Sequence, residues 1–360
     1  MKVAIIGASG FIGNRLMEQF HLGLKHQVVP IVRQPCRLAL PARFAVDWRI
    51  ANALDTPALA QALTDCDAVV HAALGDPLQI EAMPVALTAA AAMAGISRIV
   101  YLSTASVHGQ APATGTTEAS PLHSRHSIEY NNAKVRAEEC FFRECKRHQI
   151  AGFALRPGIV YGPRSRWITE TAHDLRHGQA WLFDQGAGIC NGIYVDNLCS
   201  AVAAALAAPA DKAGPYLVGD SEKITWRDFY HRLAAGLGID PSGIVPLDKI
   251  PHFKRSAGAN IQRVIANPNV QRLLPFIPSR IKSTTKQFLA AVHATPSPST
   301  WRLPSAPALR ITEELVLLQQ CQWKFSHQPA TDDLLYQPRV SFAEALSRSL
   351  AWLAFAEGRT

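Results

Sequence analysis

The sequence predicts an α/β protein with a doubly wound parallel sheet, followed by a smaller, mostly helical region. Two observations predict this class. In the first 160 residues, short apolar runs alternate with segments of helical periodicity, which is typical of parallel strands joined by helical crossovers. The first apolar run also ends in a glycine-rich turn that opens a helix, as the first strand of such a sheet does.

The elements are expected in a regular order. A strand at 3–6 leads into a helix whose apolar residues Ile12, Leu16 and Phe20 recur at helical spacing. Further strands are expected at 27–32, 44–46, 68–70, 99–102 and 153–155, with helices at 59–63, 85–94 and 127–148. After residue 165 we expect strands at 193–195 and 216–218, helices at 196–208 and 225–237, and a helix near the C-terminus.

The composition limits the classes of protein and ligand. The 360 residues are 48% hydrophobic and 18% charged, which is enough to bury a sizeable core. The formal net charge of +8 suits an anionic ligand such as a phosphorylated cofactor or a nucleotide-linked substrate. We expect no nucleic-acid partner, because no stretch interleaves dense basic residues with exposed aromatic residues.

The cysteines and the first residues indicate the compartment. Seven cysteines are scattered without a Cys-x-x-Cys pair, so we expect neither a disulfide framework nor a metal site. The sequence enters its first strand directly, without a secretory apolar segment. We therefore expect a cytoplasmic protein.

The glycine turn is the first candidate binding site. It lies between a predicted strand and a predicted helix and reads Gly7-Ala8-Ser9-Gly10-Phe11-Ile12-Gly13. Gly7 permits the tight turn, Gly10 lets a pyrophosphate approach the backbone, and Gly13 lets helix and strand pack closely. The phosphates would lie against free N–H groups at the helix N-terminus, where the helix dipole favours negative charge. This context favours a dinucleotide site over an ordinary glycine-rich turn.

The end of the second predicted strand bears on the choice of dinucleotide. In such sites, a residue about 20 positions after the turn binds the adenosine ribose. This chain has Arg33 at that position. An acidic residue there would bind the 2′-hydroxyl of NAD, whereas a guanidinium suits the 2′-phosphate of NADP, and Arg37 can assist. The alternative is a solvated surface arginine. We expect NADP, with NAD as the second choice.

Tyr130 and Lys134 form the candidate catalytic pair. They lie four residues apart on one predicted helix and so share a face. A nearby ammonium favours the phenolate, so Lys134 is expected to lower the pKa of Tyr130 toward a range useful for proton transfer. Upstream, Ser103, Thr104 and Ser106 follow a buried strand, at the edge of the sheet where ligands bind. Thr104 is the hydroxyl expected to hold the substrate oxygen, and capping of the strand end is the alternative role of all three.

These motifs, in this order, resemble the extended short-chain dehydrogenase/reductase superfamily, and the match covers most of the chain. The superfamily includes nucleotide-sugar epimerases and dehydratases, 3β-hydroxysteroid dehydrogenases and dihydroflavonol-type reductases. The resemblance implies that Tyr130 is the general acid in reduction, that Lys134 binds the nicotinamide ribose, and that Thr104 holds the reacting oxygen. It further implies a cofactor-binding set, which is Gly7, Ser9, Gly10, Phe11, Ile12, Gly13, Arg33, Asn52, Ala53, His71, Ala72, Ala73, Ser103, Tyr130, Lys134, Pro157 and Val160.

The resemblance also implies a Rossmann domain at residues 1–163 and a substrate-binding region at 164–360, with sheet elements near 189–218 that return to the core.

Two features depart from the superfamily's pattern. Asn52 and Ala53 stand where an aspartate near the adenine is usual, although the Asn52 amide oxygen can still accept a hydrogen bond from the adenine amino group. Residues 240–310 are longer and more basic than the usual substrate region, so the resemblance does not name the substrate.

Three functions stay open. The leading interpretation is an NADP-dependent oxidoreductase that interconverts a carbonyl and a secondary alcohol. The second is a nucleotide-sugar epimerase or dehydratase with retained NAD, which Arg164 and Arg166 favour because they could meet a diphosphate. The third is a non-catalytic NADP-binding regulator, against which the intact Thr104, Tyr130 and Lys134 argue.

Three further features have two readings each. His71 and His108 could act as a second acid or base, but they fit better as ordinary residues at strand ends. The apolar and basic stretch at 273–281 could touch a membrane surface, but it fits better as a segment over the substrate cleft. The long helix that carries Tyr130 offers a surface for a homodimer.

Overall fold

The computed structural model describes residues 1–23, 26–39, 41–251, 253 and 309–358. The described residues up to Ile250 and from Leu309 onward belong to one compact unit. The stretch at 273–281, for which we considered contact with a membrane surface, lies outside the described residues. Among the described helices, none has the length and apolar character needed to cross a membrane.

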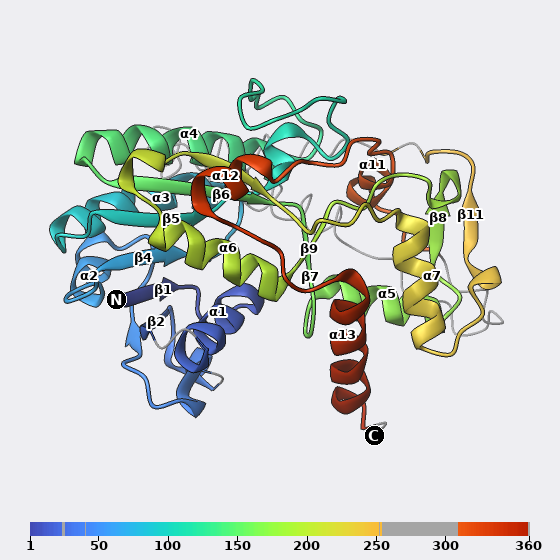
Figure 1. The fold of residues 1–360 in the computed structure, drawn as a ribbon, viewed down its shortest axis with the longest axis horizontal. Helices are drawn as coiled ribbons and strands as arrows, with labels where there is room; N and C mark the ends of the chain where they lie inside the picture. The colour runs from blue at the N-terminus through green and yellow to red at the C-terminus, as the bar shows by residue number, and fades with distance from the viewer. Residues whose placement is uncertain (24–25, 40, 252, 254–308, 359–360) are drawn as a thin grey trace, which may run out of the picture. The chain divides into compact units, whose positions relative to one another are not determined.

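A seven-stranded parallel sheet forms the centre of the unit and confirms the predicted fold class (Figure 1). Its strands run in the order β10-β6-β5-β4-β1-β2-β3, and every neighbouring pair is parallel. The bounds of the strands are β1 (Lys2–Ile6), β2 (Gln27–Val32), β3 (Arg49–Ile50), β4 (Ala68–His71), β5 (Arg98–Leu102), β6 (Ala151–Pro157) and β10 (Pro215–Val218).

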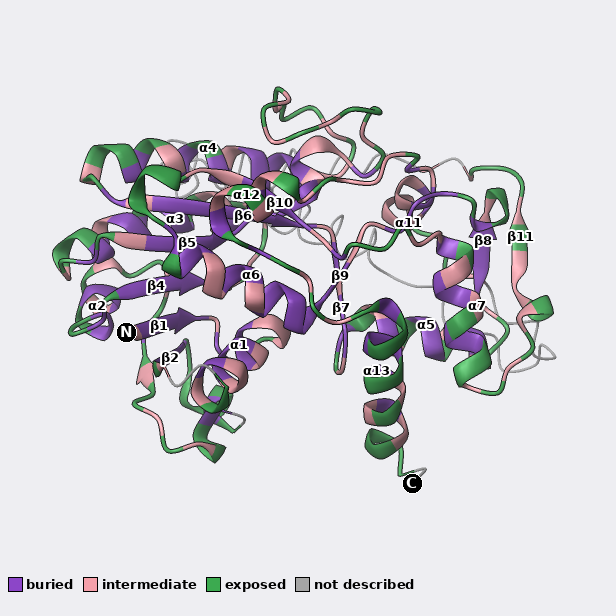
Figure 2. Ribbon diagram, viewed as in Figure 1, coloured by how far each residue is buried: buried purple, intermediate pink, exposed green. Residues whose placement is uncertain are grey.

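The apolar runs become strands because helices bury both faces of the sheet, and its central strands are mostly purple (buried) in Figure 2. Along β1, Val3 and Ile5 belong to one core, and Ala4 and Ile6 belong to the other. The first core is covered by α1 (Phe11–Leu22), α6 (Val195–Ala207) and α12 (Gln328–Leu334). The second is covered by α2 (Thr56–Ala62), α3 (Pro77–Met93) and α4 (Glu129–His148).

The third strand is shorter and later than the sequence indicates, and the prediction of a strand at 44–46 is wrong. β3 pairs only two residues with β2, at the edge of the sheet. The Arg49 guanidinium donates to the carbonyl oxygens of Ala62 at 2.9 Å and Thr64 at 2.6 Å. Because polar bonds rather than an apolar run hold this strand, a search for apolar runs does not find it.

The rest of the unit packs around a third core, which joins short strands to helices from both halves of the chain. Its strands pair as β7 (Ile159–Tyr161) with β9 (Gly192–Tyr194) and β8 (Trp181–Phe183) with β11 (Val245–Leu247). Its helices are α5 (Arg166–Arg176), α7 (Trp226–Gly236), α11 (Glu313–Gln319) and α13 (Phe342–Ala356). Short 3-10 turns are η1 (Pro35–Leu38), η2 (Pro41–Arg43), η3 (Ala105–His108), η4 (Asp184–Gly186), η5 (Ala210–Lys212) and η6 (Pro241–Gly243).

Asn197, near the start of α6, attaches the C-terminal segment to this region. Its Oδ1 accepts hydrogen bonds from the backbone N–H groups of Arg339 and Val340, both at 3.0 Å. Its Nδ2 donates to Asp220 at 2.7 Å, and the same carboxylate accepts the Tyr161 hydroxyl at 2.8 Å. One buried amide thus satisfies the backbone of the segment that leads into α13.

Candidate functional site

A cavity of about 990 Å³ opens at the carboxyl ends of the central strands. Its lining includes Gly7 after β1, Ala72 after β4, Thr104 after β5 and Gly158 after β6. Ligands of open parallel sheets bind at this edge, next to the point where the strand order reverses. The volume is at the upper end of the range for small-molecule sites.

The glycine turn forms one wall of the cavity through close packing of backbone on backbone. Gly7 has φ +86°, and a Cβ there would lie 2.7 Å from the backbone nitrogen of Ala73. A Cβ on Gly13 would lie 2.2 Å from the carbonyl oxygen of Gly7, so the third glycine permits the contact of α1 with the turn. The N-terminus of α1 therefore faces the cavity, as a bound pyrophosphate requires.

The adenosine end predicted from the sequence lies in the same cavity. Arg33 and Arg37 are exposed and line it together with Asn52 and Ala53. The side-chain oxygen of Asn52 accepts the backbone N–H of Leu54 at 3.2 Å, which orients the amide. Two guanidinium groups at one end give this part of the cavity a positive charge.

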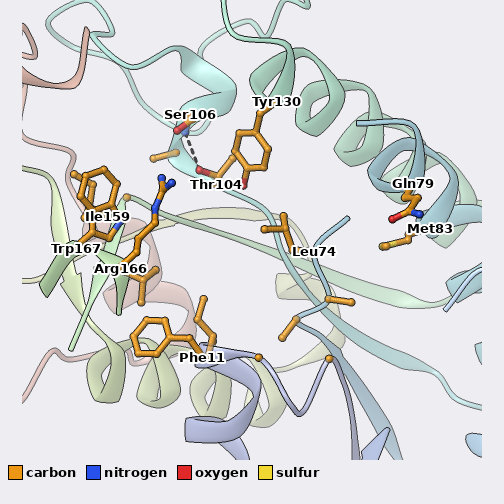
Figure 3. A pocket seen from close by; sticks show the side chains of 18 of the residues that line it. Phe11, Leu74, Gln79, Met83, Thr104, Ser106, Tyr130, Ile159, Arg166 and Trp167 are labelled. Atoms are coloured by element: carbon orange, nitrogen blue, oxygen red, sulfur yellow. Dashed lines mark hydrogen bonds between the residues drawn. The ribbon is translucent and has the colours of Figure 1, made fainter. Parts of the chain in front are cut away.

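Thr104 and Tyr130 point into the middle of the cavity, as Figure 3 shows. The Thr104 Oγ1 accepts the backbone N–H of Ser106 at 3.2 Å and so caps the short turn η3. This bond leaves the hydroxyl proton of Thr104 free, because a hydroxyl that accepts one bond still has its own proton to donate. That proton is available to an oxygen bound beside the Tyr130 phenol.

Lys134 is buried behind Tyr130 and does not line the cavity. Its Nζ donates to the carbonyl oxygen of Leu102 at 3.0 Å and lies 5.2 Å from the centre of the Tyr101 ring. Burial lowers the pKa of Lys134 to about 8, although Glu138 opposes this shift.

The pKa of Tyr130 is raised to about 12, opposite in direction to the expectation from the sequence. Burial is the largest cause, Glu314 adds to it, and Arg166 opposes it. The phenol is therefore protonated at neutral pH, which is the state that an acid needs in order to protonate a carbonyl oxygen during reduction.

Ser103 belongs to a buried network behind the cavity. Its hydroxyl donates to the Glu138 carboxylate, which also accepts the Arg156 Nε at 3.0 Å. Arg156 in turn donates to the His108 Nε2 at 3.1 Å. Burial and the neighbouring Arg156 lower the pKa of His108 to about 4, so the imidazole is neutral and accepts this bond.

His71 is buried and stacked on Tyr101, with ring centres 5.4 Å apart. Burial, and to a smaller extent the charge of Lys134, lower its pKa to about 3. Its ring nitrogens have no hydrogen-bond partner within the described part of the chain. Neither His71 nor His108 is among the described residues that line the cavity.

The structure brings most of the predicted residues to one surface. The cavity is lined by Gly7, Ser9, Gly10, Phe11, Ile12, Arg33, Asn52, Ala53, Ala72, Ala73, Thr104, Tyr130 and Val160. Behind this lining lie Gly13, His71, Ser103, Lys134 and Pro157. The two sets are adjacent along the chain, so each motif places its segment at the cavity while some of its side chains lie behind the lining.

Sequence reasoning missed several residues that line the cavity. They come from scattered segments and include Leu74, Met83, Gln110, Asn191, Trp226, Glu314, Leu318 and Phe325. A local signal for one of them exists: Thr312 caps α11 by accepting the N–H of Leu315 at 3.3 Å, with Glu313 and Glu314 in the first turn. A hydroxyl followed by two acidic residues predicts a helix start.

The family comparison shows the family to which this chain belongs. Residues 3–219 match the model of the NAD dependent epimerase/dehydratase family. A 2-alkyl-3-oxoalkanoate reductase from Stenotrophomonas maltophilia (strain K279a) is 27% identical, over 97% of this chain and 98% of the relative. A dTDP-6-deoxy-L-talose 4-dehydrogenase (NAD(P)(+)) from Kitasatospora kifunensis is 34% identical, over 45% of this chain and 53% of the relative.

Solved structures share the fold at low sequence identity. A dTDP-glucose 4,6-dehydratase from Streptomyces venezuelae, with NAD bound, aligns with a TM-score of 0.70 and 18% identity over 99% of this chain and 98% of that chain. A UDP-glucuronic acid 4-epimerase from Bacillus cereus, also with NAD, aligns with a TM-score of 0.69 and 16% identity over 100% and 99%.

Proposed function

Because this chain belongs to the NAD dependent epimerase/dehydratase family, of the extended short-chain dehydrogenase/reductase type, we propose that it is an NADP-dependent oxidoreductase. The proposed reaction interconverts a carbonyl and a secondary alcohol. The observation that carries it is the placement of the Tyr130 phenol and the Thr104 hydroxyl on one cavity with the glycine turn. The carbonyl would be bound between these two hydroxyls and the nicotinamide.

The side chains have separate roles in this reaction. A nicotinamide cofactor, held by the glycine turn and Arg33, would supply the hydride for the carbonyl carbon. Tyr130, protonated at neutral pH, gives its proton to the carbonyl oxygen, while Thr104 donates a hydrogen bond to the same oxygen. In this proposal the charge of Lys134, one turn further along the same helix, stabilises the phenolate that remains. In the free protein, Arg166 is the cation that lowers the pKa of Tyr130.

The proposal of NADP over NAD rests on Arg33 and Arg37. Both line the adenosine end of the cavity and are exposed there. A planar guanidinium makes paired hydrogen bonds to a phosphate, and no carboxylate is present among the described lining residues at this end to bind a 2′-hydroxyl instead.

Reduction is favoured over dehydration by the shortage of acidic groups. Elimination of water needs an acid for the departing hydroxyl and a base for the neighbouring carbon. The two residues that follow Thr104, which are Ala105 and Ser106, are not acidic. Of the described residues that line the cavity, only Glu314 carries a carboxylate, and it is paired with Arg166. The full-length similarity to a 2-alkyl-3-oxoalkanoate reductase supports the same choice.

A nucleotide-sugar epimerase with retained NAD is the second candidate. Arg164 and Arg166 both line the cavity, and this candidate requires both to meet a diphosphate, although Arg164 donates to Asn14 on α1 in the free protein. We further propose that residues 1–163 bind the cofactor and that 164–360 bind the substrate. The lining of the far end by residues from 164 to 226 and from 314 to 325 supports this division.

The first experiment is a fluorescence titration of the purified protein with NADPH and with NADH, together with an assay for cofactor that copurifies. We expect exchangeable NADPH to bind more tightly, and Arg33→Ala to remove the preference. Tightly retained NAD would refute the NADP assignment and move the epimerase to first place.

Tyr130→Phe tests the catalytic assignment. The variant keeps the ring but loses the proton, so we expect the rate of carbonyl reduction to fall about 10²- to 10⁴-fold while the affinity for NADPH is unchanged. A variant that retains full activity would show that Tyr130 is not the acid.

A further inference from the structure

Arg166 and Glu314 form an ion pair at the substrate end of the cavity. The Arg166 Nη2 donates to both Glu314 carboxylate oxygens, at 3.2 and 3.4 Å. The two side chains come from the start of α5 and the first turn of α11, which lie 148 residues apart in the chain. Both line the same cavity as Tyr130.

The pair is built so that it can open. The Arg166 side chain is 56% exposed and that of Glu314 is 36% exposed, and exposed ion pairs contribute little to stability. Both bonds come from a single guanidinium nitrogen. A bidentate pair would use two nitrogens, one for each carboxylate oxygen, so the guanidinium still has unused donors. The Trp167 ring lies 4.7 Å from the guanidinium carbon and keeps the charge in place when Glu314 leaves.

The pair lies close to the reacting groups. In Figure 3 the Arg166 guanidinium is directed toward Thr104 and Tyr130. The charges of Arg166 and Glu314 shift the pKa of Tyr130 in opposite directions, as charges near a phenol do. A group bound by Arg166 would therefore lie near the carbonyl that Tyr130 protonates.

In the part of the chain that the structure describes, the surroundings of the pair suit one charged group rather than two. The neighbouring Arg164 guanidinium turns away from the substrate end and donates to Asn14 on α1, at 2.8 Å. The rest of this end is mainly apolar, lined by Ile128, Ile159, Trp226, Leu318 and Phe325. A diphosphate would need several cations here, whereas one carboxylate needs one guanidinium and leaves the apolar walls to a hydrocarbon chain.

We propose that Arg166 binds a substrate carboxylate, and that Glu314 occupies this position until the substrate displaces it. The substrate class is then an oxo acid, or the matching hydroxy acid, with its carboxylate close to the reacting carbonyl and an apolar chain. This inference rests on the proposed function for its reaction, but the carboxylate site is separate from the hydride step. Arg166 is a specificity-determining residue in this scheme, and Glu314 keeps its charge compensated in the free enzyme.

The kinetic test compares an acid with its ester. The purified enzyme is assayed with NADPH, 3-oxodecanoate and methyl 3-oxodecanoate, by the loss of NADPH absorbance. Because Arg166 and Glu314 also shift the pKa of Tyr130, the readout is the ratio of kcat/KM for the acid to that for the ester. We expect Arg166→Gln to lower this ratio about 10- to 100-fold, as loss of a charge-assisted hydrogen bond implies. Glu314→Gln removes the internal competitor, so it should lower the KM for the acid relative to that for the ester.

The matched control is Arg176→Gln, at the other end of α5. Arg176 pairs with Glu357 and does not line the cavity. This variant removes one arginine from the same helix, and we expect no change in the preference for the acid. If Arg166→Gln reduces turnover of acid and ester equally, the carboxylate site is refuted while the reductase proposal stands.

Binding without turnover separates the two proposals. Decanoate has no carbonyl to reduce, so calorimetric titration of decanoate into the enzyme with NADP⁺ reports the carboxylate site alone. We expect saturable binding that Arg166→Gln weakens about 10- to 100-fold. Binding of UDP that depends on Arg166 more strongly than binding of decanoate would overturn the proposal in favour of a diphosphate. Decanoate binding with no NADPH-dependent turnover of either ketone would refute the reductase instead.

Discussion

Arg156 on β6 and Glu138 on α4 form an ion pair whose side chains are 3% and 2% exposed. The pair joins a central strand to the helix that carries Tyr130 and Lys134. Ser103, at the end of β5, donates its hydroxyl to the same carboxylate. Three elements of the sheet and its covering layer therefore meet at one buried carboxylate, on the helix that carries Tyr130.

Glu138→Gln should destabilise the fold by about 3–5 kcal/mol, because it leaves the Arg156 charge buried without its counterion. The measurement is the free energy of unfolding in urea. Arg143→Gln is the control, since it removes an exposed arginine from the same helix. The double variant Glu138→Leu with Arg156→Met should be more stable than Glu138→Gln alone. Equal losses in the single and double variants would contradict this account.

The pH dependence of reduction should follow Lys134. Its pKa is lowered to about 8, so the ammonium is present below pH 8 and is lost as the pH rises through that value. The pKa of Tyr130, about 12, is too high for the phenol to titrate in this range. We expect kcat/KM for carbonyl reduction to fall above about pH 8, measured from pH 6 to 10. A profile that is flat to pH 10 would show that the charge of Lys134 is not needed.

Glu138 provides a check on this assignment. Its negative charge raises the pKa of Lys134 against the effect of burial. Glu138→Gln should therefore move the fall in activity to lower pH, measured at a temperature where the variant remains folded. A shift to higher pH would assign the profile to another group.

Gly13→Ala should disrupt the cofactor site. The added Cβ would lie 2.2 Å from the carbonyl oxygen of Gly7, so α1 must move away from the turn. We expect a loss of about 1–3 kcal/mol in stability and at least tenfold weaker NADPH binding, measured by fluorescence titration. At Gly214 a Cβ would meet no atom within 4 Å, and Gly214→Ala is the control. Unchanged NADPH affinity in Gly13→Ala would contradict the role given to the turn.

Asn197→Ala should loosen the C-terminal segment. The change leaves the backbone N–H groups of Arg339 and Val340 without their acceptor, at a cost of about 1–3 kcal/mol. Limited proteolysis should then cut this segment faster than in the wild type. Ser200→Ala, which removes one hydrogen bond on the same helix, should not have this effect. Equal cleavage rates in the wild type and Asn197→Ala would argue against the attachment.

The sequence predicted the central sheet well because its strands are buried on both faces. An apolar run such as Gln27–Val32 is a strand with the same bounds in the structure. The edge strand β3 escaped prediction because its pairing depends on two residues and on polar bonds from Arg49. Local composition identifies an element only when burial, rather than a distant hydrogen bond, holds it in place.

The site residues fall into two similar groups, those that lie in local motifs and those that distant contacts bring to the cavity. Tyr130, Thr104 and the glycine turn lie in local motifs whose spacing has a direct chemical reason, so their segments were found. Glu314 reaches the cavity from far along the chain, and no local pattern indicates which residue it meets. The raised pKa of Tyr130 likewise depends on burial and on Glu314, neither of which can be seen in the spacing of Tyr130 and Lys134.

The helix α11, which carries Glu314, contributes to the cavity without contributing to the central sheet. Substitutions on this helix can therefore reshape one end of the cavity while the glycine turn and Tyr130 keep their positions. During evolution, a duplicated copy of such a gene could acquire a new preference through a few changes in one short helix. The hydride chemistry would be inherited unchanged, and only the choice of molecule that receives it would diverge.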